Sequence, residues 1–71
     1  MESNLVTIRG YDWYGEWTMI FDLDAIAGAI GKRDEEGRLL ITKPAVRRIL
    51  ELIRRLGSPE EIAKAERMLK V

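Results

Sequence analysis

The strongest constraint on the fold is an amphipathic pattern over residues 43–56. Its apolar residues recur at intervals of three and four, which places them on one face of a helix. They are Val46, Ile49, Leu50, Ile53 and Leu56. Thr42 is suited to cap this helix, Pro44 falls in the first turn where its missing N–H costs little, and Gly57 ends the pattern. We therefore predict a helix over 43–56 whose stripe carries much of the core.

A second helix follows almost at once. Ser58, Pro59 and Glu61 match a capping box with proline at the first helical position, which predicts a helix over 59–70. The short link makes the two helices neighbours, arranged either as an antiparallel hairpin or as an angled helix-turn-helix.

The N-terminal part of the chain is typical of β structure. Residues 5–9 and 17–21 are rich in β-branched and aromatic side chains, and Asp12 and Gly15 fit the first and last positions of a type I turn between them. We predict one β-hairpin over residues 4–22, with a bulge at Gly10.

Alternation along the second strand places Trp17, Met19 and Phe21 on the face toward the core. The sequence does not set the pairing register. The first strand therefore contributes either Val6 and Ile8 or Leu5 and Thr7 to that face.

Between the hairpin and the long helix, Asp22 is a good N-cap and Gly31 a plausible stop for a helix over 23–31. Residues 38–41 form either a short third strand or an extended lead-in to the next helix. The predicted fold class is α+β, a single domain over residues 1–71 in which the hairpin packs on three helices.

Composition excludes several kinds of chemistry. The chain has no cysteine and no histidine, so it lacks disulfides, a thiol nucleophile, the usual general base and the usual zinc ligands. Residues 28–32 lack the spacing and the hydroxyl of a phosphate-binding loop, and loops starting at Asp22 or Asp34 lack the glycine and glutamate of a calcium site. We expect no cofactor, no metal and no catalytic residue.

We find no secretory signal and no apolar run near the roughly 20 residues of a membrane span. We therefore expect a soluble cytoplasmic protein with no membrane partner. Its charged fraction of 34% is also consistent with heat stability.

The formal charge sums to zero but is unevenly distributed. Residues 1–24 carry a net charge of −4 and residues 43–57 a net charge of +4. The two segments either face each other within the fold, or are merely solvated, or meet an oppositely charged partner.

Aromatic residues are concentrated around the predicted turn. Four of the five in the chain fall within seven positions: Tyr11, Trp13, Tyr14 and Trp17. Tryptophan and tyrosine are favoured anchors of protein interfaces, so these residues are our candidate protein-binding site. The alternative is structural: Trp17 and Tyr11 cover the helices, and Trp13 pairs across the hairpin.

A basic stripe on the long helix is the second candidate site, formed by Arg47, Arg48, Arg54 and Arg55. With the helix that follows, it could contact phosphates as a helix-turn-helix. Two features count against this reading. Glu51 lies within the stripe and can pair with its arginines, and residues 59–70 lack the amide and hydroxyl side chains that read base edges.

The segments 45–57 and 57–70 resemble the idealised helices of computationally designed miniproteins, with near-ideal caps and salt-bridge spacing. The resemblance covers about the last 40% of the chain. It implies a designed α+β scaffold. Gly10, Gly28 and the aromatic cluster depart from that style.

The sequence thus predicts a small non-catalytic interaction module or designed scaffold. It would bind a protein, or associate with itself as a homodimer, through the aromatic hairpin. Nucleic-acid binding by the arginine stripe is the alternative.

Overall fold

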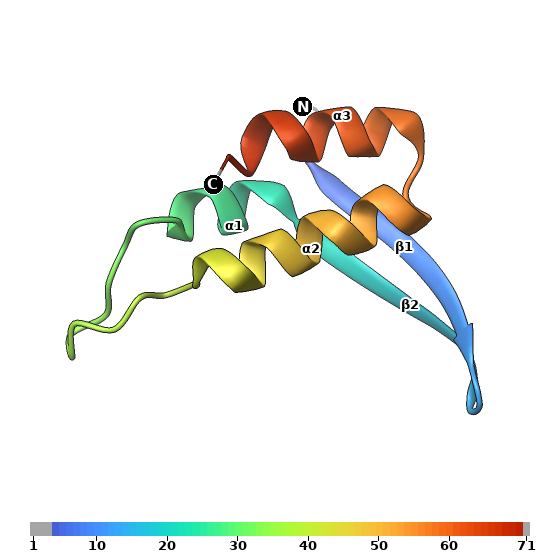
Figure 1. Ribbon diagram of the computed structural model, residues 1–71, viewed down its shortest axis with the longest axis horizontal. Coiled ribbons are helices and arrows are strands. Elements are labelled where there is room, and N and C mark those ends of the chain that lie inside the picture. The colour runs from blue at the N-terminus through green and yellow to red at the C-terminus, as the bar shows by residue number, and fades with distance from the viewer. Residues whose placement is uncertain (1–3, 71) are drawn as a thin grey trace.

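The protein consists of a β-hairpin and three helices, shown in Figure 1. A computed structural model describes residues 4–70. The elements in chain order are β1 (Leu5–Asp12), β2 (Gly15–Asp22), α1 (Leu23–Ala29), α2 (Lys43–Leu56) and α3 (Pro59–Met68). This confirms the predicted α+β class.

β1 and β2 pair antiparallel in one uninterrupted register, from Leu5 opposite Asp22 to Asp12 opposite Gly15. The predicted bulge at Gly10 is therefore wrong, since Gly10 pairs directly with a residue of β2 like its neighbours. The register also selects between the two candidate faces of β1. Val6 and Ile8 are buried, whereas Leu5 is half exposed on the opposite face.

The core lies between the open end of the hairpin and all three helices. Apolar side chains from β1, α1, α2 and the C-terminal end of the chain form one buried cluster. Its members are Val6, Ile8, Leu23, Val46, Leu50, Ile53, Ala65 and Leu69. Fully burying each of the larger side chains contributes about 1.5–3 kcal/mol, so the predicted stripe of α2 supplies much of the stabilisation.

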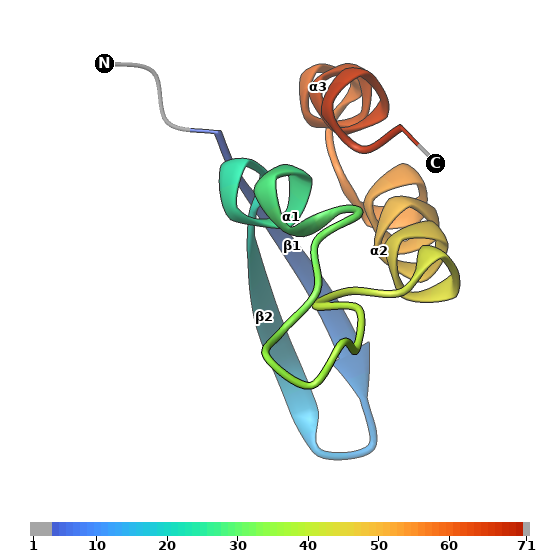
Figure 2. The ribbon, with the colours of Figure 1, turned by 90° about the vertical axis from the view of Figure 1, so that its left-hand side faces the viewer.

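α2 and α3 form an antiparallel helical hairpin, as the two views in Figures 1 and 2 show. Both predicted caps are present: Thr42 Oγ1 accepts from the Ala45 N–H at 3.3 Å, and Ser58 Oγ accepts from the Glu61 N–H at 3.2 Å. The bounds of α2 match the prediction. α3 ends at Met68 rather than at residue 70, because Leu69 leaves the helical conformation and is buried in the core.

α1 is also shorter than predicted, since Ile30 adopts an extended conformation and caps the helix after Ala29. Of the two alternatives for residues 38–41, the third strand of the sheet does not form. Their backbone turns back on the loop instead: the Leu40 N–H donates to the Lys32 carbonyl at 2.9 Å. Asp34 closes this loop, because its side chain accepts from two backbone N–H groups within it.

One carboxylate joins the helical hairpin to the β-hairpin. Glu61 Oε1 accepts from the Ser58 N–H at 2.9 Å, which completes the capping box. Its other oxygen, Oε2, accepts from the backbone N–H of Thr7 in β1 at 3.1 Å. A strand at the edge of a sheet exposes unpaired N–H groups, and Glu61 satisfies one of them.

These contacts lower the pKa of Glu61. The main cause is the hydrogen bond from the Ser58 backbone, which partial burial opposes and the Thr7 backbone N–H reinforces. The unfolded chain therefore binds more protons than the folded one when the pH lies between the two pKa values. The stabilisation is fully present above about pH 4.5 and is lost as the pH falls through the lowered pKa of the folded state.

We predict that Glu61→Gln lowers the free energy of unfolding by about 1–2 kcal/mol at pH 7, because hydrogen bonds to a charged acceptor are lost. The difference from the wild type should shrink as the pH falls through the lowered pKa of Glu61. Urea denaturation between pH 7 and pH 3 measures it. Glu60→Gln is the control, since Glu60 lies exposed on the same helical turn. A Glu61→Gln deficit that does not change with pH would contradict this account.

Candidate binding site

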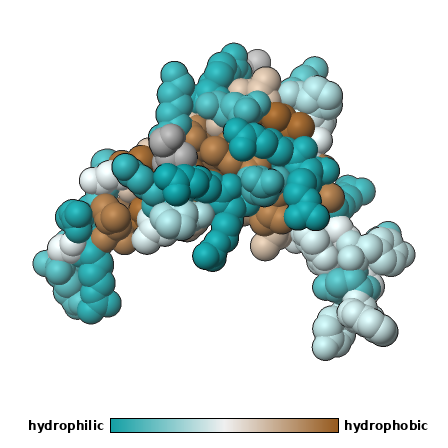
Figure 3. Space-filling model, viewed as in Figure 1, coloured by the Kyte–Doolittle hydropathy of each residue, from teal (hydrophilic) through white to brown (hydrophobic). Residues whose placement is uncertain are grey.

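The hairpin extends beyond the helices and ends in an exposed aromatic tip (Figures 1 and 2). Trp13 and Tyr14 form the two-residue connection between β1 and β2, and each side chain is 98% exposed. In the space-filling view the tip stands apart from the apolar body of the molecule (Figure 3).

Local hydrogen bonding holds the turn. Asp12 Oδ1 accepts from the backbone N–H of Tyr14 at 2.8 Å. Gly15 has φ +111°, a conformation that glycine adopts without steric cost, while Trp13 and Tyr14 both have negative φ. Two large aromatic residues therefore occupy the turn without backbone strain.

The structure separates the four aromatic candidates into two groups. Tyr11 lies opposite Glu16 on the outer face of the hairpin, 78% exposed and next to the tip. Trp17 lies on the other face, half buried against the core. Tyr11, Trp13 and Tyr14 thus form one exposed group, which we call the aromatic tip, and Trp17 supports the hairpin from within.

Trp17 packs on its cross-strand partner, Gly10. A Cβ atom added at Gly10 would lie 2.0 Å from Cζ2 of the Trp17 indole, so the ring occupies the space that any other side chain would need. An aromatic side chain over a cross-strand glycine covers backbone that would otherwise be bare. This contact stiffens the distal half of the hairpin that carries the tip.

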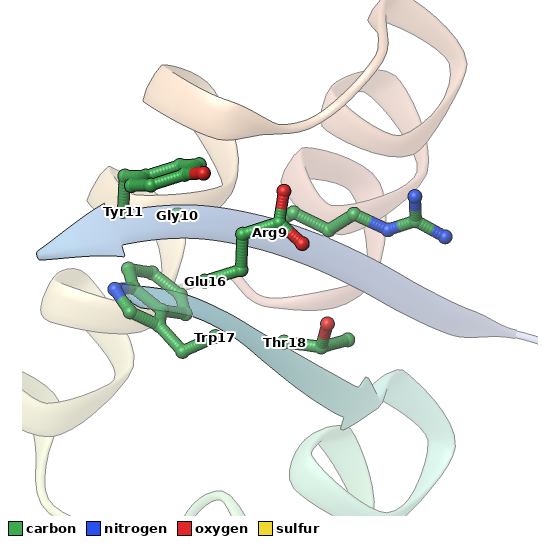
Figure 4. A pocket seen from close by; sticks show the side chains of 6 residues that line it. All are labelled: Arg9, Gly10, Tyr11, Glu16, Trp17 and Thr18. Atoms are coloured by element: carbon green, nitrogen blue, oxygen red, sulfur yellow. The ribbon is translucent and has the colours of Figure 1, made fainter. Parts of the chain in front are cut away.

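Behind the tip, the two strands form an open pocket of about 400 Å³ (Figure 4). It is lined by Arg9, Gly10, Tyr11, Glu16, Trp17 and Thr18. Figure 4 shows the Glu16 side chain crossing from β2 toward β1, while Arg9 directs its guanidinium away from Tyr11. Asp12 and Glu16, both exposed, give the tip its negative charge.

The four arginines of the second candidate site are all exposed on α2. Arg54 contacts Glu66 of α3, with Nη2 at 3.0 Å and Nε at 3.3 Å from the same carboxylate oxygen. Glu51, within the stripe, forms no ion pair in residues 4–70. Arg47, Arg48 and Arg55 also form no ion pair with any other residue of this range.

Within residues 4–70, no three acidic side chains lie close enough together to hold a metal ion. The same residues contain no helix with the length and apolarity needed to cross a membrane. A scan against family models, a search of curated proteins and a search of solved structures each gave no match.

Sequence reasoning missed two features of this site. It interpreted Gly10 as a bulge, although extending the pairing outward from Asp12 and Gly15 places Gly10 opposite Trp17. The same counting places Glu16 opposite Tyr11 and so identifies the acidic neighbour of the tip. The position of the turn in the sequence was therefore enough to predict both pairings.

We predict that Gly10→Ala lowers the free energy of unfolding by about 1–3 kcal/mol, since the Trp17 ring must move aside. Gly28→Ala is the matched control. An added Cβ there meets nothing within 4 Å, and alanine in a helix should stabilise the protein by about 0.5–1 kcal/mol. Urea denaturation of both variants measures the effects. Equal stability of the two variants would show that Trp17 does not depend on a bare Gly10.

Proposed function

We propose that this chain is a small non-catalytic interaction module that binds protein through the aromatic tip, Tyr11, Trp13 and Tyr14. The observation that carries the proposal is the 98% exposure of both Trp13 and Tyr14. These residues contribute almost nothing to the core, although a small domain has few large side chains to spare.

The form of the tip supports binding. Tryptophan and tyrosine offer large contact areas with only two rotatable side-chain torsions, so little conformational entropy is lost when they are immobilised. The Asp12–Tyr14 hydrogen bond and the Trp17–Gly10 packing order the backbone in advance. A preordered binding surface retains more of its contact energy as affinity.

The surroundings of the tip indicate the chemistry of the partner. Asp12 and Glu16 flank the aromatic residues, so a partner with basic side chains is favoured. The same exposure argues against catalysis, because a carboxylate acting as an acid or base needs an apolar site that raises its pKa. A designed scaffold displaying a binding hairpin would fit this description, and the resemblance to designed miniproteins stays a prediction.

Nucleic-acid binding through the arginine stripe has less support. A helix-turn-helix sets its two helices at about 90–120°, whereas α2 and α3 run antiparallel. One of the four arginines, Arg54, is already paired with Glu66. This function remains the alternative.

The double variant Trp13→Ala/Tyr14→Ala tests the proposal. Replacing two fully exposed side chains should change the free energy of unfolding by no more than about 0.5 kcal/mol each. Peptides selected from a random displayed library on the wild-type protein should lose binding to this variant. The control is Leu39→Ala/Leu40→Ala, which removes exposed apolar side chains from the loop before α2. Selected peptides that bind the tip variant as well as the wild type would refute the proposed site.

A further inference from the structure

We propose that the partner of the aromatic tip is a second copy of this chain, and that the tip docks on the arginine-bearing face of α2. The inference rests on the proposed function, because it uses the same aromatic residues. It adds the receiving surface, which comprises Arg47, Arg48 and Arg55.

The hairpin tip and the outer face of α2 carry opposite charges. The tip carries Asp12 and Glu16, and the outer face of α2 carries the three arginines. The ion pairs in residues 4–70 join Arg38 to Glu36 and Arg54 to Glu66, and neither neutralises the tip or these arginines. Since the formal net charge is zero, two copies also approach without overall repulsion.

The position of the hairpin also favours contact between two chains. Figure 1 shows the hairpin projecting past the C-terminal end of α2, and within residues 4–70 no ion pair joins Asp12 or Glu16 to an arginine of α2. Both surfaces therefore remain available for contact between two chains.

The side chains on the two surfaces are also chemically complementary. A guanidinium group stacks on the face of tryptophan or tyrosine and forms hydrogen bonds to a carboxylate in the same plane. The pocket beside the tip offers both, since Tyr11 and Glu16 face each other across the strands. One arginine of a second chain would satisfy the ring and the carboxylate together.

The area available is sufficient for specific association. Aromatic side chains bury about 150–250 Å² each, so the three residues of the tip supply roughly 450–750 Å². A standard interface buries about 800 Å² per partner. The flanking acids, Asp12 and Glu16, supply the remainder on the side of the tip.

A charge-swap experiment tests the pairing directly. Glu16→Arg reverses the charge beside the aromatic tip. Arg48→Glu/Arg55→Glu reverses the charge of the arginine stripe and keeps the Arg54–Glu66 pair intact. Asp12 is left unchanged because it holds the turn. Each variant alone places like charges in the contact, whereas the mixture restores opposite charges in every contact between unlike chains. The control is Arg67→Glu, which alters an exposed charge on α3 outside both surfaces.

Sedimentation velocity over a range of concentrations gives the outcome, with circular dichroism confirming that every variant is folded. We expect the wild type and the control to exceed the monomer mass of 8.2 kDa as concentration rises. Each swapped variant alone should associate at least about tenfold more weakly, and the mixture should recover association.

Three results would overturn the inference. The wild type could stay monomeric up to about 1 mM, a concentration at which even weak specific pairs form. The mixture could fail to recover what the single variants lose. A monomeric wild type could instead be retained on nucleic acid at low salt and released by the stripe variant, which would assign the arginines to phosphate binding. None of these decides the proposed function, which the peptide selection tests independently.

Discussion

The structure depends on how far the helices cover one face of the hairpin. A two-stranded sheet is marginally stable in water unless something packs against it. The helices bury Val6 and Ile8 near the open end of the hairpin, but they do not extend to its tip. Beyond Ile8, the Trp17 ring covers this face of the sheet by packing on Gly10. Residues 11–16 take no part in the core, so the turn exposes its aromatic side chains to solvent.

The carboxylate of Glu61 ties the two halves of the molecule together. It completes the cap of α3 and also accepts from the edge of β1, so the start of one helix is fixed against one strand. The residue that completes a local helix cap thus also forms a tertiary contact. The same bond covers part of an exposed strand edge, which otherwise tends to pair with other chains. It does not cover the distal part of the hairpin.

The features that could be predicted from the sequence are those set by local chemistry. Thr42 and Gly57 define α2 because caps and periodicity act within a few residues. The turn, the capping box and the candidate aromatic residues could be predicted from the sequence for the same reason. The contacts of Glu61 with Thr7 and of Arg54 with Glu66 join distant residues, so local pattern carries no signal for them. Residues 38–41 have strand-like composition, but Leu39 pairs with Arg33 in its own loop and not with β1 or β2.

The central claim is that the hairpin displays Trp13 in solvent while holding Trp17 in the fold. The chain has two tryptophans, so Trp17→Phe and Trp13→Phe each leave a single fluorescent reporter. Acrylamide quenching in dilute solution compares their exposure directly. We predict that Trp13 is quenched nearly as efficiently as a free indole and that Trp17 is substantially protected. Equal protection of both tryptophans would mean that the tip folds back on the body, and would contradict the account.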